Sequence, residues 1–377
     1  MRNTLAVLGL SLFVGCATQF SPGPDAGSPS GSGDMTTAGS GAASGTSSSG
    51  GSASGGDHVV AGGSGSGGGG QGAGSGGGAG PGDAGGGGNT GDGGPAHPPG
   101  DGGEGTGAAC PAASTFKVGD TNQTIQFQGM TRQYIVHVPT GYTGKTPVPL
   151  VMDYHPILLD YNFERTNSGY ATKADQEGFV VVFPNGIDNA WNVGPCCTSS
   201  RTVDDVGFSK AVISAVEGQL CIDNKRVYAV GYSMGGGMAM KMACDAADII
   251  AAIAPAAFDL MDPSNNWVCQ PSRPITVVAF RSTGDPVVPY NGGPTNPPNG
   301  LPITITFLGA VGTFKKWAQL DTCTGSAVDN SGLGTGCQTY KQCGQGVEVT
   351  LCTKQGGGHD TGDPNVGWSE ISRYQLP

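Results

Sequence analysis

Ser233 is the residue of this chain whose setting points most clearly to chemistry. It lies in the middle of residues 231–235, which have the pattern G-x-S-x-G and join an apolar run to a stretch of small residues. Gly231 and Gly235 allow a sharp turn from a strand into a helix, and such a turn leaves the serine hydroxyl exposed at the helix N-terminus. The pattern therefore predicts a nucleophilic serine, with the Met234 N–H directed at an oxyanion that forms on a substrate.

A nucleophilic serine needs a base that accepts its proton, and the chain has three histidines after residue 110. His137 lies within an alternating apolar and polar run, which favours a structural role. His155 ends an apolar run, whereas His359 lies in a glycine-rich segment near the C-terminus. In α/β-hydrolases the order along the chain is serine, then acid, then histidine. Only His359 follows Ser233, so we expect His359 to be the base.

The base must be oriented by an acid that lies between the serine and the histidine in the chain. Asp285 comes soon after the apolar run 275–280, which places it just beyond a predicted strand. Asp259 and Asp262 follow an earlier apolar run (residues 251–257) and are the alternatives. Because the triad needs its acid at a strand end, we expect Asp285 to fill this role.

The second oxyanion donor is expected in the loop that follows the apolar run 149–154. Pro156 in this loop has no N–H, so Ile157, the next residue, is the expected donor. The residues suggested for contacts with substrate are Tyr232, Trp191 and His155. A tryptophan buried in the core and a histidine that orders the loop are the alternatives for the last two.

Apolar runs alternate with helical stretches throughout residues 110–377. Residues 132–139 alternate apolar and polar side chains, as a half-exposed antiparallel strand does. Continuous apolar runs, typical of buried parallel strands, occupy residues 149–154, 179–183, 227–230, 275–280 and 347–352. The clearest amphipathic helix is 204–216, which begins with two acidic residues. This alternation predicts an α/β fold with a mostly parallel, doubly wound sheet, in which ligands bind beyond the carboxyl ends of the strands.

The composition divides the chain in two. Residues 17–109 consist almost entirely of Gly, Ser, Ala, Pro, Thr and Asp, with no lysine or arginine. Such a segment cannot bury enough apolar surface to offset the entropy that ordering it costs. We therefore expect residues 16–109 to be a disordered Gly/Ser-rich linker and residues 110–377 to be one hydrolase domain.

The first residues are predicted to be a targeting segment. The apolar run that ends at Val14 is too short to span a bilayer, so residues 1–15 are interpreted as a signal peptide of the lipoprotein type. Residues 12–16 resemble a bacterial lipobox, which makes Cys16 a candidate for lipidation. The chain is therefore expected to be secreted, or attached to the cell surface of a bacterium through a lipid on Cys16.

Ten further cysteines lie after residue 109, and an even number in an exported domain predicts disulfides. Cys196 and Cys197 are adjacent and are expected to bond to two different partners. The absence of C-x-x-C pairs argues against a zinc site, so no metal is expected. The net charge of −11 and the lack of a basic cluster argue against nucleic acid and against an anionic membrane surface as partners.

Several segments together resemble the secreted esterase family that includes polyhydroxybutyrate depolymerase-like proteins and feruloyl esterases of bacteria and fungi. The shared segments are residues 132–134, 149–151, 184–186, 191–192 with 196–197, 203–208, 226–228, 231–235, 251–255 and 285–290. The resemblance implies an α/β-hydrolase fold, an acid at Asp285 and a base at His359. The chain departs from the family at Pro156, where glycine is common, and at Asp360, where a tryptophan often follows the histidine.

The triad and the resemblance predict a serine carboxylic-ester hydrolase that works through an acyl-enzyme and needs no cofactor. Its expected partner is an ester substrate, which the linker would let it reach in polymeric form, and it is expected to be a monomer. Feruloyl or related esters of plant cell-wall polysaccharide are the first choice, and a polyhydroxybutyrate-type polyester is the alternative. A surface lipoprotein that binds polymer without turnover is a further alternative, because a fold does not fix a function.

Overall fold

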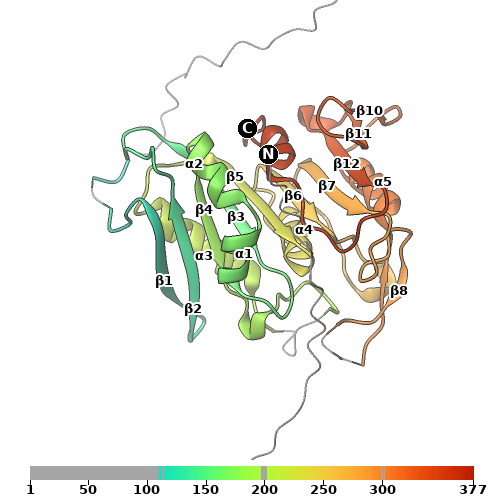
Figure 1. The fold of residues 1–377 in the computed structure, drawn as a ribbon, viewed down its shortest axis with the longest axis horizontal. Coiled ribbons are helices and arrows are strands. Elements are labelled where there is room, and N and C mark those ends of the chain that lie inside the picture. The colour runs from blue at the N-terminus through green and yellow to red at the C-terminus, as the bar shows by residue number, and fades with distance from the viewer. Residues whose placement is uncertain (1–109, 113, 197–201, 299, 301) are drawn as a thin grey trace, which may run out of the picture. The chain divides into compact units, whose positions relative to one another are not determined.

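The computed structural model describes residues 110–377 except 113, 197–201, 299 and 301 (Figure 1). These residues belong to a compact unit that spans residues 93–377. The signal peptide, Cys16 and the Gly/Ser-rich linker that the sequence predicts lie outside the described residues. Within the described part of the chain, no helix has both the length and the apolar character needed to cross a membrane.

A ten-stranded sheet forms the centre of this unit (Figure 1). In sheet order its strands are β1 (Gly119–Phe127), β2 (Met130–Val138), β4 (Val180–Pro184), β3 (Val148–Tyr154), β5 (Ile222–Tyr232), β6 (Ala252–Ala256), β7 (Thr276–Ser282), β12 (Val349–Lys354), β11 (Cys337–Tyr340) and β10 (Val328–Asp329). The six strands from β4 to β12 are parallel, and the pairs at the two edges are antiparallel. A separate hairpin pairs β8 (Gly293–Thr295) with β9 (Ile305–Phe307).

Helices cover both faces of the sheet (Figure 1). On one face lie α3 (Asp205–Glu217), α4 (Met234–Asp245) and α5 (Ala310–Leu320), and on the other lie α1 (Tyr161–Asn167), α2 (Tyr170–Glu177) and α6 (Pro364–Ile371). Three short 3₁₀ turns occupy Ile187–Asn189, Pro263–Asn265 and Gly344–Gly346. This arrangement confirms the prediction of a mostly parallel, doubly wound sheet of the α/β-hydrolase type.

The predicted strands and the predicted helix occur within a few residues of their expected positions. Four strands of the sheet, β1, β6, β10 and β11, were not among the predicted strands, although β6 lies within the apolar run 251–257. Strand β6 reads Ala-Ile-Ala-Pro-Ala, and Pro255 within it has no N–H to donate to a neighbouring strand. Strand β1 is polar along much of its length because it lies at the exposed edge of the sheet.

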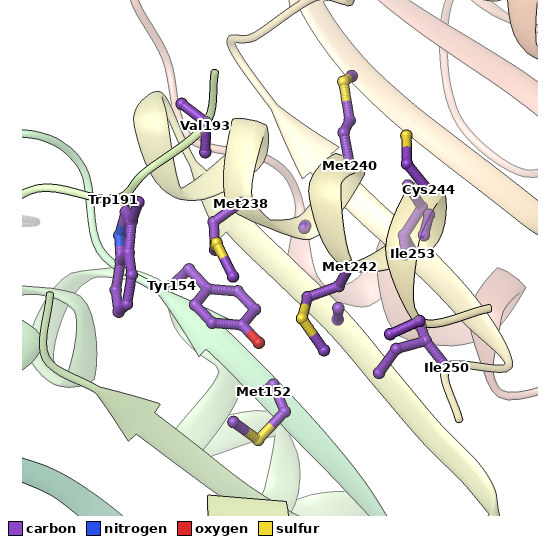
Figure 2. Close-up of a cluster of buried hydrophobic side chains, with 14 of the residues drawn as sticks. Met152, Tyr154, Trp191, Val193, Met238, Met240, Met242, Cys244, Ile250 and Ile253 are labelled. Carbon is purple, nitrogen blue, oxygen red and sulfur yellow. The ribbon is translucent and has the colours of Figure 1, made fainter. Parts of the chain in front are cut away.

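The core beneath α4 is rich in methionine. In Figure 2, Met238 and Met242 of α4 lie close to Tyr154 and Met152 of β3, and all four side chains are buried. The first turn of α4 is built from glycines, so this helix can approach the sheet closely. A Cβ atom on Gly236 would lie 2.6 Å from the Ala256 carbonyl oxygen. Unbranched, flexible methionine side chains can fill the irregular space that such a close approach leaves.

Four disulfides join described cysteines: Cys110–Cys221, Cys244–Cys269, Cys323–Cys343 and Cys337–Cys352. They confirm the prediction that the domain carries disulfides. The expectation that Cys196 and Cys197 bond to two different partners among these cysteines is wrong, because the eight cysteines of the four disulfides are already paired with each other. Cys197 itself lies outside the described residues.

Candidate active site

Ser233 occupies a strained turn between β5 and α4. Its φ of 55° and ψ of −123° lie in a region that costs free energy for any residue other than glycine. The turn is held by the Ser233 N–H, which donates to the Ala256 carbonyl oxygen at 2.9 Å. A Cβ atom on Gly231 would lie 2.5 Å from the Gly235 carbonyl carbon, and one on Gly235 would overlap the Tyr154 carbonyl oxygen. The two glycines of the G-x-S-x-G pattern are therefore required by the space that the turn leaves.

The structure brings Ser233, His359 and Asp285 together in a chain of hydrogen bonds. The Ser233 Oγ lies 2.7 Å from Nε2 of His359. Nδ1 of His359 lies 3.0 Å and 2.9 Å from the two carboxylate oxygens of Asp285. This is the geometry in which an imidazole accepts the serine proton while a carboxylate holds the opposite ring nitrogen protonated.

The Asp285 carboxylate is held by its own turn as well as by His359. Its Oδ1 accepts hydrogen bonds from the N–H groups of Val287 at 2.8 Å and Val288 at 3.0 Å. Burial alone would raise the pKa of Asp285, but the hydrogen bond and charge interaction with His359 and these two N–H groups lower it below its ordinary value. The carboxyl group is therefore ionised, as an acid that orients the base must be.

The two alternative acids lie elsewhere. Asp259 is buried and forms an ion pair with Arg281, and Asp262 caps the 3₁₀ turn at residues 263–265. Nη2 of Arg281 also donates to the Val288 carbonyl oxygen at 2.6 Å and lies 3.8 Å from Asp285. Arg281 and Asp259 thus brace the turn that carries Asp285. No sequence pattern pointed to Arg281, because a lone arginine near a strand end has no signature.

Tyr232 was suggested for contacts with substrate, and the structure places its hydroxyl on the base. The Tyr232 hydroxyl donates to the His359 carbonyl oxygen at 2.7 Å, and the two rings lie 5.1 Å apart. Burial raises the pKa of the Tyr232 hydroxyl, and nearby carboxylates raise it further. The phenol therefore stays protonated and keeps this hydrogen bond.

His155 orders the loop that precedes Ile157. Its Nδ1 donates to the Pro156 carbonyl oxygen at 2.8 Å, and its Nε2 accepts the Gly186 N–H at 2.9 Å. Burial lowers the pKa of His155 to about 4, so the ring is neutral, as these two bonds require. His155 has no exposed surface and so offers none to a substrate.

Trp191 is also fully buried, between His155 and Tyr154, where Figure 2 shows its ring beside Tyr154. Its Nε1 donates to the His155 carbonyl oxygen at 2.8 Å. Its position against His155 keeps the ring away from solvent, which corresponds to the core alternative.

Segments that carry the family resemblance converge behind this loop. Arg132 and Asp205 form a buried ion pair of 2.7 Å, and Arg132 also donates to the Asn185 carbonyl oxygen at 3.1 Å. The other oxygen of Asp205 accepts the Asn192 N–H at 2.7 Å. In the sequence these residues stood out only because they belong to segments that resemble the family. The structure shows that their side chains join β2, α3 and the loop before residue 193.

An apolar cavity of about 30 Å³ lies beside Ser233. Its walls include Ile157, Met234, Phe258, Val287, Val288 and Phe307, together with residues 295–298 of the Pro-rich loop. The two residues expected to donate N–H groups to the oxyanion, Met234 and Ile157, thus line the same cavity as the serine. The Met234 N–H belongs to the first turn of α4, where amides have no acceptor within the helix. In the described part of the chain, no group of three or more His, Cys, Asp or Glu residues could hold a metal ion.

Comparison with known proteins finds proteins named as esterases among those similar to this chain, although no protein-family model matches it. Feruloyl esterase B of Piromyces equi is 43% identical over 251 residues, which are 65% of this chain and 46% of that protein. The chain is thus similar in sequence to a feruloyl esterase. It spans less than half the length of that relative.

The chain also matches more distant proteins. A putative esterase, NocK, of Nocardia uniformis subsp. tsuyamanensis is 28% identical over 63% of this chain and 73% of that protein. A probable feruloyl esterase C of Aspergillus flavus is 27% identical over 63% of this chain and 79% of that protein. Among solved structures, an acetyl xylan esterase from Aspergillus awamori has a TM-score of 0.46 at 16% identity, and the match covers 63% of this chain and 94% of that one.

Proposed function

We propose that this chain is a serine carboxylic-ester hydrolase that acts through an acyl-enzyme on feruloyl or related esters of plant cell-wall polysaccharide. The observation that carries the reaction type is the hydrogen-bonded chain from Ser233 through His359 to Asp285. The similarity to feruloyl esterase B supports the substrate class.

The geometry suits acyl transfer in two steps. His359 accepts the Ser233 proton through Nε2 as Oγ attacks the ester carbonyl carbon, and Asp285 stabilises the imidazolium that forms. The N–H groups of Met234 and Ile157 are proposed to stabilise the oxyanion. His359 then donates its proton to the leaving alkoxide, and in the second step it activates the water that releases the acid.

The cavity beside Ser233 favours an apolar acyl group. Its aromatic walls, Phe258 and Phe307, lie with their ring centroids 5.1 Å apart in an edge-to-face arrangement. A short aliphatic acyl group would bury apolar surface there at about 25 cal/mol per Å², whereas a feruloyl ring is larger than the cavity and would extend past its walls. The sugar alcohol of a cell-wall ester, which carries many hydroxyl groups, would lie outside the apolar cavity, at the mouth of the site.

An extracellular location is part of this proposal. The four disulfides of the described residues support it, because disulfides persist mainly in oxidising compartments. Export by the signal peptide of residues 1–15 and lipidation of Cys16 remain predictions from sequence.

The substrate proposal is tested by parallel hydrolysis of methyl ferulate, p-nitrophenyl acetate and a polyhydroxybutyrate suspension. We expect the wild-type chain to hydrolyse methyl ferulate and p-nitrophenyl acetate and to leave the polyester turbid. Clearing of the polyester without turnover of ferulate would replace the proposed substrate with a hydroxyalkanoate polyester. A folded protein that a fluorophosphonate does not label and that hydrolyses none of the three would favour polymer binding without turnover.

A further inference from the structure

The loop that carries His359 has little rigidity of its own. Residues 356–358 are three consecutive glycines, and Gly356 and Gly357 have positive φ values of 67° and 64°. Glycine loses more conformational entropy on ordering than any other residue. External contacts must therefore hold this loop if His359 is to stay within hydrogen-bond distance of Ser233.

Close packing does not supply all of these contacts. A cavity of about 300 Å³ borders the far side of the loop, and its lining includes Asp360, Ser282 and Lys354. Hydrogen bonds across the edge of the sheet therefore help to hold this loop.

Asp360, the residue after His359, makes three of these hydrogen bonds, in addition to the two that Gly356 makes with the Gly284 N–H at 2.8 Å and the Thr283 Oγ1 at 2.9 Å. One carboxylate oxygen, Oδ2, accepts from the Ser282 Oγ at 2.9 Å, from Nζ of Lys354 at 3.0 Å and from the Gly358 N–H at 3.0 Å. Ser282 and Lys354 are the last residues of β7 and β12 and are paired in register. The carboxylate thus joins the histidine loop to the carboxyl ends of two neighbouring strands.

The glycine at 357 is what allows this approach. A Cβ atom there would lie 2.6 Å from Oδ2 of Asp360 and 2.9 Å from the Ser282 Oγ. Partial burial would raise the pKa of Asp360, but its hydrogen bonds with Lys354, Gly358 and Ser282 lower it, so the group is ionised at neutral pH.

We propose that Asp360 is a positioning residue that holds the His359 loop in its reactive geometry by tying it to β7 and β12. Asp360 holds the residue before His359 through the Gly358 N–H, while the Tyr232 hydroxyl donates to the carbonyl oxygen of His359 itself. The effect of Asp360 on rate rests on the proposed esterase function, whereas its effect on the loop does not.

The test compares Asp360→Ala with Asp363→Asn in the full chain. Asp363 is exposed, caps α6 through Asn365 and Val366, and accepts replacement by asparagine, which is also a good N-cap. Both variants remove one negative charge from the same segment, and only Asp360→Ala removes the hydrogen bonds to Ser282, Lys354 and Gly358. Hydrogen exchange of residues 355–360 and the kinetics of p-nitrophenyl acetate hydrolysis are measured for each.

We expect Asp360→Ala to speed exchange in residues 355–360 and to lower kcat by about 10- to 100-fold with KM unchanged, because small displacements of a catalytic group cost rate. Asp363→Asn should match the wild type in both readouts. Asp360→Asn, which keeps an acceptor oxygen but not the charge, should fall between them. Adding Ser282→Ala to Asp360→Ala should lower kcat little further, since the two residues act through the hydrogen bond that joins them.

Unchanged exchange in Asp360→Ala, or an equal loss of kcat in Asp363→Asn, would overturn the proposal. If the wild-type chain showed no esterase activity, the proposed function would fail, and the exchange measurement would still decide whether Asp360 holds the loop.

Discussion

Replacing Ser233 with alanine is expected to lower kcat/KM for ester hydrolysis by about 10⁴- to 10⁶-fold, as removal of a triad nucleophile does elsewhere. The alanine variant keeps the backbone of the elbow and the cavity beside it, so substrate binding should persist. The Ser233 side chain makes its hydrogen bond to His359, so the free energy of unfolding should change by about 1 kcal/mol or less. Initial rates and urea unfolding measure the two quantities.

Ser264→Ala is the matched control for this variant, because Ser264 is an exposed serine in the 3₁₀ turn at residues 263–265. It should hydrolyse esters at the wild-type rate. Activity that survives in the Ser233 variant would remove Ser233 as the nucleophile, and with it the assignment of the site.

The second large effect is expected from Asp285→Asn, which should lower kcat by about 10³- to 10⁴-fold. Asparagine has nearly the same shape as aspartate, but it cannot stabilise the imidazolium of His359 and it favours the wrong tautomer. Asp259→Asn is the matched comparison, since Asp259 lies against Arg281, away from the base. That variant should keep kcat within about tenfold while it loses about 3 kcal/mol of stability, because it leaves a buried arginine with a weaker partner.

The Asp285 variant should also change the pH dependence of stability. The pKa of Asp285 is lowered in the folded chain, so its carboxylate stabilises the fold above the ordinary carboxyl range, and this contribution is lost as the pH falls through the folded pKa. The difference in unfolding free energy between wild type and Asp285→Asn should therefore be full at pH 7 and shrink below about pH 4. An equal difference at all pH values, or a loss of kcat in Asp259→Asn as large as in Asp285→Asn, would contradict the assignment of Asp285.

The residues proposed for the triad were accessible from the sequence because each carries a local signal. The turn at Ser233 is marked by two glycines at fixed spacing, and Asp285 follows an apolar run. His359 is the one histidine that follows Ser233 in the chain, as the order serine, acid, histidine requires. The structure brings the three within hydrogen-bond distance of one another.

The parts of the site that escaped prediction depend on contacts between distant segments. Arg281 binds the turn that carries Asp285, and its guanidinium is paired with Asp259, 22 residues earlier in the chain. No spacing rule connects Arg281 with Asp259. Trp191 and His155 looked like residues that could contact a substrate, and only the structure shows that both are buried against each other. Strand β6 lies within the apolar run 251–257, but alanine and proline have low strand propensity, and its place in the sheet comes from β5 and β7 on either side.

The central claim is that Ser233 forms a covalent acyl-enzyme, and mass spectrometry of peptides from the acid-quenched enzyme tests it most directly. The wild-type chain is mixed with p-nitrophenyl acetate, quenched in acid within the first turnovers and digested for peptide mapping. We predict a mass increase of one acetyl group on the peptide that contains Ser233, and no such increase in Ser233→Ala. Steady release of p-nitrophenol with no acylated Ser233 peptide, or an acetyl group on another residue that turns over at the catalytic rate, would contradict the account.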